Sequence, residues 1–200
     1  MCASPPASPL VRSGCRRQLS SCKAVRSRVM PRALRLTLVQ ANLAMLEAAI
    51  EGSGALSVAL DGCAIAAGWE VFPEALPRAR DHLAADPAGG RWGTRLFIVH
   101  EPRVLVGWGG FKGPPVDGTV ELGYSIAPGF RQRGLASDAV RQMLKDAFSD
   151  PLVGTVIAQT LGAPDASTRI LERAGFACEG DLPHDDFGPL WRWRHDRPTA

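Results

Sequence analysis

The 200-residue chain lacks the features that mark membrane, disulfide-rich and zinc-binding proteins. It has no apolar run close to the roughly 20 residues that a membrane-spanning helix needs, so no membrane partner is expected. Its five cysteines form no CxxC pair and their number is odd, which predicts neither a metal site nor a disulfide framework. A reducing cytoplasm is therefore the expected location. Tyrosine is almost missing, because Tyr124 is the only one.

Acidic residues are absent from positions 1–46, which hold eight of the 23 arginines and lysines. The other 15 basic residues stand against all 20 acidic residues in the rest of the chain. The net charge of +3 thus hides a mildly acidic remainder. Surfaces that bind nucleic acid are basic, so no nucleic-acid partner is expected for this part.

Residues 1–30 are rich in Ser, Pro and Arg and show no hydrophobic period, which is typical of a disordered tail. Transit peptides share this composition, and an over-extended start ahead of Met30 is a further alternative. A secretory signal is not indicated, because no apolar stretch follows the basic residues. We expect residues 31–200 to form a single domain, since that length suffices for a sizeable core.

The most informative stretch predicts a strand, a basic turn and a helix in succession. Residues 120–126 are rich in β-forming residues, and the helix expected from Leu135 to Phe148 carries its apolar residues in one stripe. The turn between them reads Arg131-Gln132-Arg133-Gly134-Leu135-Ala136. A helix N-terminus presents unpaired N–H groups and partial positive charge, and Gly134 leaves the backbone open, so this turn suits a pyrophosphate. An ordinary turn with two solvated arginines is the alternative.

Hydrophobic periodicity predicts a mixed α+β protein. We expect strands at 34–39, 95–100, 104–111, 152–160, 176–180 and 190–194, and helices after Asn42 and at 73–85, 135–148 and 166–174. The strand at 152–160 should run parallel to the one at 120–126, because a crossover helix joins them. The apolar segment 56–67 has no clear period, and its structure is left open.

Two blocks of the sequence resemble the GCN5-related N-acetyltransferases (GNAT). The pattern Arg131-x-x-Gly134-x-Ala136, after Glu121-Leu122-Gly123-Tyr124, is similar to the acetyl-CoA signature of that family. Residues 158–176 (AQTLGAPDASTRILERAGF) resemble the next block, and are most similar to the RimJ/RimL-like branch of ribosomal-protein alanine acetyltransferases. The resemblance covers residues 91–194. It implies a GNAT fold, with a mixed central sheet, a splayed strand pair and helices on both faces.

The resemblance also implies an N-acetyltransferase. Such an enzyme moves the acetyl group of acetyl-CoA to a primary amine, on a protein N-terminus or a small molecule, by direct attack in a ternary complex. Acetyl-CoA is implied as a co-substrate, and no metal is. In the family the pantetheine arm fits the gap beside the splayed strand. Its backbone partners would be Tyr124, Ser125, Ile126 and Ala127, and the pyrophosphate would be held by Arg131, Gln132, Arg133, Gly134, Leu135 and Ala136.

Glu121 is the best candidate for a general base that deprotonates the amine, directly or through water. A carboxylate on a central strand needs a reason to be there, and pairing with an arginine or an exposed strand end is the alternative. The face of the strand on which Glu121 lies follows from side-chain alternation, and a bulge in the strand would change that face. Without a bulge, Glu121 and Ser125 lie on one face of the strand, and Leu122, Tyr124 and Ile126 lie on the other.

Two positions depart from the family pattern. Many members carry a tyrosine that protonates the leaving thiolate where this chain has Glu172, and Ser167 is the expected stand-in. Asp165 replaces an asparagine that contacts the cofactor; it can cap a helix but cannot donate a hydrogen bond when ionised. These departures leave a second hypothesis open, a non-catalytic acyl-CoA-binding or interaction module with the same fold.

The sequence does not identify the acceptor. The early helical region forms one wall of the acceptor pocket in the family, which makes Trp69, Phe72 and His82 candidates for substrate contact. Core packing of the two aromatic residues and solvent exposure of His82 are the favoured alternatives. The sequence neither requires nor excludes a homodimer.

Overall fold

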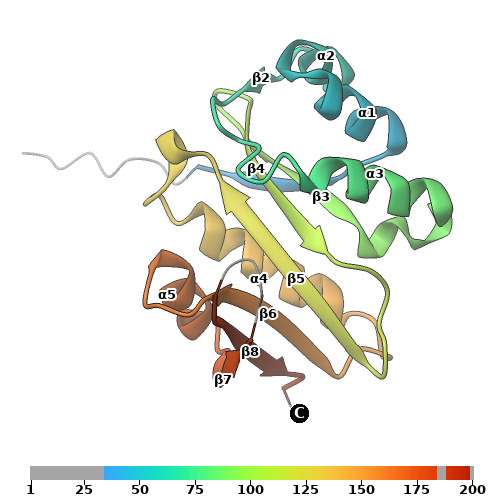
Figure 1. Cartoon of the computed structure of the whole chain (residues 1–200). Coiled ribbons are helices and arrows are strands. Elements are labelled where there is room, and N and C mark those ends of the chain that lie inside the picture. The colour runs from blue at the N-terminus through green and yellow to red at the C-terminus, as the bar shows by residue number, and fades with distance from the viewer. Residues whose placement is uncertain (1–33, 184–187, 199–200) are drawn as a thin grey trace, which may run out of the picture. The chain divides into compact units, whose positions relative to one another are not determined.

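The structure is a computed structural model that describes residues 34–183 and 188–198 (Figure 1). The interpretation of residues 1–30 lies outside the described residues. In chain order the elements are β1 (Leu36–Gln40), α1 (Leu43–Glu51), α2 (Ser53–Ala59), β2 (Ala64–Ile65), α3 (Ala75–Ala85), the 3-10 helix η1 (Pro87–Trp92), β3 (Thr94–Val99), β4 (Val104–Phe111), β5 (Thr119–Ile126), the 3-10 helix η2 (Pro128–Phe130), α4 (Leu135–Phe148), β6 (Thr155–Leu161), α5 (Ala166–Arg173), β7 (Ala177–Leu182) and β8 (Leu190–Asp196). Within the described residues, none of the helices combines the length and the apolar character that crossing a membrane requires.

The strands form one mixed sheet in the order β1-β3-β4-β5-β6-β8-β7, and β2 pairs with β4 outside this path. β5 and β6 are parallel, as is the short β2–β4 pair, and the other neighbours are antiparallel. α4 is the crossover between β5 and β6, and it lies behind β5 in Figure 1. The mixed sheet and the parallel pairing that the sequence predicts are both confirmed.

Two aromatic residues of β4 show what covers each face of the sheet. The guanidinium of Arg95 lies over the ring of Phe111 and also binds Asp146 of α4, so α4 packs on this face, the α4 face. Side chains alternate between the two faces along a strand, so Trp108, three residues before Phe111, lies on the opposite face. Its ring makes an edge-on contact with Trp69, from the segment between β2 and α3, at 6.4 Å between centroids. We call this opposite side the Trp69 face.

Local sequence explains where the helices begin and end. The Asn42 side chain accepts the Met45 N–H at 2.8 Å and caps α1. Gly52, with φ 137°, separates α1 from α2, and α2 extends into the segment that the sequence left open. α4 buries the predicted stripe: Leu135, Ala139, Val140, Met143, Leu144 and Ala147. Each large side chain of that stripe contributes about 1.5–3 kcal/mol to stability.

Both ends of α5 are capped as the sequence predicts. Asp165 Oδ1 accepts the Thr168 N–H at 2.9 Å, and Thr168 Oγ1 accepts the Asp165 N–H at 3.0 Å, which forms a capping box. At the other end Gly175 has φ 89°, and the Phe176 N–H donates to the Leu171 carbonyl at 3.0 Å. These caps fix the position of the first turn of α5 directly after β6.

β5 keeps its side-chain alternation, because the irregularity lies in its neighbour. The β3–β4 register shifts by one residue, which leaves Val106 of β4 as the extra residue. β5 pairs with β4 without a shift, and Ser125 stands opposite Trp108. A Cβ on Gly107 of β4 would lie 2.2 Å from the Ser125 carbonyl oxygen, so glycine permits this close approach. Glu121 and Ser125 therefore share the Trp69 face, whereas Leu122, Tyr124 and Ile126 share the α4 face.

Candidate functional site

β5 and β6 separate along their length and open a gap. They pair only where residues 119–122 meet residues 155–158. Beyond those pairs β5 continues beside β4 and β6 continues beside β8, with no ladder pair between β5 and β6 in the described sheet. Backbone groups that face the gap lack strand partners, so an extended ligand can pair with them. The splayed strand pair that the family resemblance implies is present.

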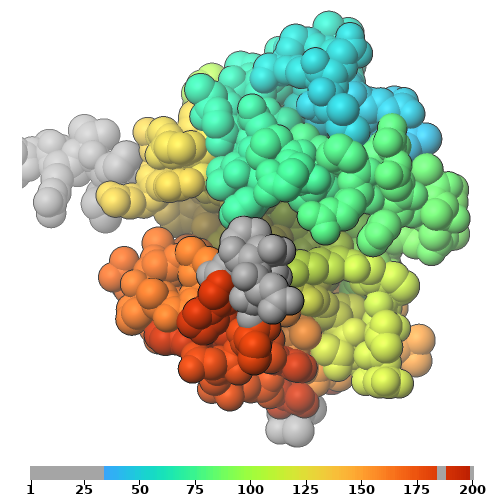
Figure 2. Space-filling view, in the orientation of Figure 1, coloured from blue at the N-terminus to red at the C-terminus, as the bar shows by residue number. Residues whose placement is uncertain are grey.

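The basic turn follows β5 and opens α4. Gln132 (φ 60°) and Gly134 (φ 80°) have left-handed backbone, and Gly134 is the N-cap of α4 without a side-chain cap. In the part of the chain that the structure describes, no backbone N–H from Gln132 through Ser137 donates a hydrogen bond. Consecutive free N–H groups around left-handed residues at a helix N-terminus form an anion-binding concavity. Figure 2 shows this turn (yellow) and α5 (orange) exposed on the same face of the molecule.

Two arginines of the turn are tied to its own backbone. Arg131 Nε donates to the Ile126 carbonyl at 3.0 Å, and Arg133 Nη2 donates to the Gly129 carbonyl at 3.1 Å. The Arg133 guanidinium also lies 5.1 Å from the centroid of the Phe130 ring. Both arginines are exposed, and each guanidinium has more N–H donors than these bonds use. The site thus combines free backbone donors with two positioned positive charges.

Glu121 is ion-paired and also lies beside the gap. Its Oε1 accepts a hydrogen bond from Lys112 Nζ, and the Glu121 side chain is 20% exposed. It stands one residue before Leu122, the last residue of β5 that pairs with β6. Gly123 follows on the same face, and a Cβ there would meet nothing within 4 Å. The structure therefore leaves open space next to the carboxylate, and its ion-pair partner is Lys112 instead of the arginine that the alternative interpretation anticipated.

The three candidates for acceptor contact, Trp69, Phe72 and His82, divide between core and surface. Trp69 is buried and His82 is exposed, as the favoured alternatives hold. Phe72 is 53% exposed, so the expectation that it covers the core is wrong; the bend ahead of α3 places it at the surface. Sequence reasoning missed five enclosed polar side-chain atoms without a hydrogen-bond partner in the described region, and two of them, Trp108 Nε1 and Glu70 Oε2, belong to residues next to Trp69. No sequence signal marks them, because enclosure depends on packing.

The first turn of α5 reaches β5 across the gap. The Tyr124 hydroxyl donates to the Ser167 carbonyl at 3.4 Å, on the α4 face. Burial raises the pKa of Tyr124, a hydrogen bond with the Ser167 side chain opposes that shift, and the charge of Asp165 adds to it. The Asp165 carboxylate serves as the cap of α5. Glu172, where many family members have a tyrosine, is exposed.

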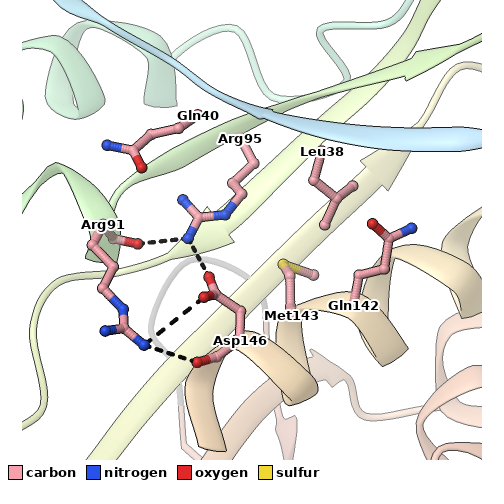
Figure 3. Close-up of a pocket in the computed structure, with 7 residues that line it drawn as sticks. All are labelled: Leu38, Gln40, Arg91, Arg95, Gln142, Met143 and Asp146. Carbon is pink, nitrogen blue, oxygen red and sulfur yellow. Dashed lines mark hydrogen bonds and ion pairs between the residues drawn. The ribbon is translucent and has the colours of Figure 1, made fainter. Parts of the chain in front are cut away.

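A cavity of about 360 Å³ lies near the opposite end of α4 (Figure 3). Its polar lining consists of Arg91, Arg95, Asp146, Gln40 and Gln142. Arg95 Nη2 donates to Asp146 Oδ2 at 2.5 Å and to the Arg91 carbonyl at 2.7 Å. Asp146 is about three helical turns, roughly 16 Å, from the start of α4. This cavity is therefore bordered by an internal ion-pair network and is separate from the gap and the basic turn.

No group of three or more His, Cys, Asp or Glu side chains among the described residues is placed to hold a metal ion. The polar residues near the gap come instead from three elements: Glu121 and Tyr124 from β5, the turn before α4, and Ser167 from α5. The arrangement can hold an anion at the turn and an extended chain along β5. A carboxylate and two hydroxyl groups lie near the same strand.

Comparison with known proteins agrees with this geometry. Residues 65–177 match the sequence family described as the acetyltransferase (GNAT) domain. Among curated proteins, no sequence matches the chain significantly. Three similar solved structures share its fold. A GNAT-family acetyltransferase from Bacillus anthracis is 21% identical, with 82% of this chain and 96% of that chain covered and a TM-score of 0.55.

The other two structures contain a coenzyme. The yncA protein of Salmonella typhimurium, solved with its cofactor acetyl-CoA, is 20% identical, covers 83% of this chain and 96% of its own, and has a TM-score of 0.56. RimL, the ribosomal L7/L12 alpha-N-protein acetyltransferase, was solved with coenzyme A. It is 13% identical, covers 80% of this chain and 93% of its own, and has a TM-score of 0.56.

Proposed function

The chain belongs to the GNAT acetyltransferase domain family and is by that membership an acetyl-CoA-dependent acyltransferase; we propose that its acceptor is a primary amine, which attacks acetyl-CoA directly in a ternary complex. One observation carries this proposal. The backbone N–H groups from Gln132 through Ser137 have no protein partner within the described residues, next to a gap between two splayed strands.

The residues present fit the co-substrate. The pyrophosphate would accept hydrogen bonds from the free N–H groups of the turn, with Arg131 and Arg133 supplying charge. The pantetheine arm would extend along Gly123–Ile126, whose gap-facing backbone groups have no strand partner. A gap-facing N–H of this segment would polarise the thioester carbonyl, because a fixed donor stabilises the developing oxyanion. Asp165 would contribute through its cap of α5, which fixes the far wall of the gap.

Glu121 would act as the general base on the amine, directly or through water. It lies beside the last β5–β6 pair, with open space above Gly123 on the same face. Lys112 holds one carboxylate oxygen, so the amine or a bridging water would use the other one. Positioning the amine and the thioester together supplies a large part of the acceleration. Ser167 lies in the first turn of α5, which reaches β5 at Tyr124.

The acceptor class is either a protein N-terminus or a small-molecule amine. RimL acts on the N-terminus of a ribosomal protein. The fold likeness to RimL supports a protein N-terminus as the acceptor, and it also supports the proposed membership of this chain in the RimJ/RimL-like branch. The exposed Phe72 and the Trp69 face would border the acceptor. We propose a wild-type assay with acetyl-CoA against a panel of N-terminal peptides and small primary amines, in which release of the CoA thiol is measured.

Two results would support the function together. Calorimetric titration of the full chain should show acetyl-CoA binding that weakens for acetyl-pantetheine, which lacks the pyrophosphate. Glu121→Gln should bind acetyl-CoA like the wild type and lose about 100-fold or more in kcat, within the usual range for a general base. Binding without transfer to any amine in the panel would instead support a non-catalytic acyl-CoA-binding module. No acetyl-CoA binding would exclude the proposed function.

A further inference from the structure

The hydroxyl of the only tyrosine in the chain lies at the gap, where β5 faces the first turn of α5. Tyr124 is two residues beyond Leu122, where pairing between β5 and β6 ends. Its side chain lies on the α4 face and its hydroxyl reaches the Ser167 carbonyl at 3.4 Å. The family resemblance leads us to expect a tyrosine on the α5 wall, where Glu172 is exposed instead. Here the phenol comes from the β5 wall and points to the same helix.

The hydrogen bond to Ser167 is weak enough to be exchanged for another. At 3.4 Å the donor–acceptor distance exceeds the 2.5–3.0 Å of a good O–H···O bond. A hydroxyl held so loosely can turn toward a stronger acceptor at little cost. A thiolate that develops in the gap is such an acceptor, because charge-assisted hydrogen bonds are about twice as strong as neutral ones.

We propose that the Tyr124 hydroxyl protonates the sulfur that leaves during acetyl transfer. The inference rests on the proposed function. The amine nitrogen forms a bond to the thioester carbonyl carbon and loses its proton to Glu121 or water. The carbon–sulfur bond then breaks, its electron pair goes to sulfur, and Tyr124 gives sulfur its proton. The phenolate recovers a proton from solvent, which has gained the one that nitrogen lost, so amine and acetyl-CoA yield amide and CoA thiol.

Tyr124 suits this role better than Ser167. A phenol is a stronger acid than an aliphatic hydroxyl, and the Tyr124 phenol lies against the Ser167 carbonyl at the first turn of α5. Burial raises the pKa of Tyr124 above its usual value near 10, so the group carries its proton throughout the neutral range. Ser167 has the supporting role: its carbonyl holds the hydroxyl while the gap is empty.

The first test removes only the hydroxyl. Tyr124→Phe should bind acetyl-CoA within threefold of the wild type and lose about 100-fold in kcat, as expected for a general acid. The matched control is Glu172→Gln on the opposite wall, which should leave kcat unchanged because Glu172 is exposed and takes no part. A Tyr124→Phe enzyme with wild-type kcat would overturn the proposal and leave the proposed function intact. A wild-type protein that transfers no acetyl group to any amine would contradict the proposed function itself.

The second test does not depend on turnover. Because Tyr124 is the only tyrosine, replacing all tyrosine by 3-fluorotyrosine labels this position alone. Its fluorine resonance should move when CoA is added to the full chain, and should move much less with desulfo-CoA, which lacks the sulfur atom. Equal shifts with both ligands would show that the ring senses the pantetheine arm and not the sulfur. That result would overturn the contact on which the proposal stands.

Discussion

Arginines lie at both ends of α4, but the two ends differ in whether their polar groups have hydrogen-bond partners in the protein. At the C-terminal end, arginine N–H groups are used by the protein: Arg197 donates to the carbonyls of Phe148, Asp150 and Val153, and Arg91 donates to the Asp146 carbonyl. Cationic donors at helix carbonyls are favourable by dipole and by hydrogen bonding. At the N-terminal end the backbone N–H groups from Gln132 through Ser137 have no partner among the described residues.

The difference separates a structural end from a binding end. Positive charge alone does not distinguish them, since arginines occur at both. What distinguishes the turn is a run of free donors that are consecutive, that begin at the exposed residues Gln132 to Gly134 and that are shaped by left-handed backbone. At the other end, Arg95 is buried and forms an ion pair with Asp146. We therefore expect substitutions at the turn to change ligand affinity, and substitutions at the C-terminal end to change stability.

The largest expected effect is on affinity, at Gly134. A Cβ there meets no protein atom within 4 Å, so Gly134→Val disturbs the protein mainly through φ 80°, at about 1–2 kcal/mol of stability. The added side chain would occupy the concavity and block several charge-assisted bonds. Acetyl-CoA affinity should fall about 100-fold, or roughly 2.7 kcal/mol, in a calorimetric titration.

Gly129 supplies the matched control for that substitution. It is also exposed with open space around its Cβ position, but its φ is not left-handed and it lies before the free N–H groups. Gly129→Val should keep acetyl-CoA affinity within about threefold, a difference below 1 kcal/mol. Equal losses for the two variants would mean that the turn binds through its general shape and not through the Gly134 backbone.

The next effect is on stability, at the other end of the helix. Asp146→Ala leaves the buried Arg95 charge without its carboxylate, and because Asp146 is itself 39% exposed, the free energy of unfolding should fall by about 2 kcal/mol. Acetyl-CoA affinity should not change. Chemical denaturation measures the first quantity and calorimetry the second. Asp138→Ala, which breaks an exposed pair with Arg141 in the first turn, should cost less than about 1 kcal/mol.

Strongly periodic elements of this fold are predictable from the sequence, and short ones are not. β4 and α4 have the bounds that the sequence predicts, because β4 is an eight-residue apolar and glycine run, α4 has one apolar stripe at helical spacing, and each ends at Gly, Pro or Ser signals. The segment 56–67 becomes the end of α2 and the two-residue β2. Neither is long enough to establish a period, and Gly52 interrupts the helical pattern just before them.

The candidate site divides along the same line. The turn residues are local in sequence, so their role can be predicted from one strand–turn–helix pattern. The Lys112–Glu121 pair was missed, although a hairpin through residues 113–118 brings the two residues together. The Tyr124–Ser167 contact joins residues 43 apart and depends on how far β5 and β6 splay. No propensity or spacing encodes that separation, so only the structure shows that the Tyr124 hydroxyl meets the Ser167 carbonyl.

The smallest effect tests charge at the binding end. Arg133→Ala removes a guanidinium that its bond to Gly129 holds beside the turn, and should weaken acetyl-CoA binding about tenfold, near 1.4 kcal/mol. Arg141→Ala removes another exposed arginine two turns into α4, which is bound to Asp138, and should change affinity less than twofold, under about 0.5 kcal/mol.

The salt dependence of acetyl-CoA affinity separates the contribution of charge from that of the backbone, because salt screens exposed charges much more than it weakens backbone N–H donors. Raising the ionic strength should shrink the difference between wild type and Arg133→Ala, whereas the loss caused by Gly134→Val should persist. If Arg133→Ala and Arg141→Ala weaken binding equally, affinity depends on the overall positive charge near α4. The contrast between its two ends would then lie in hydrogen bonding alone.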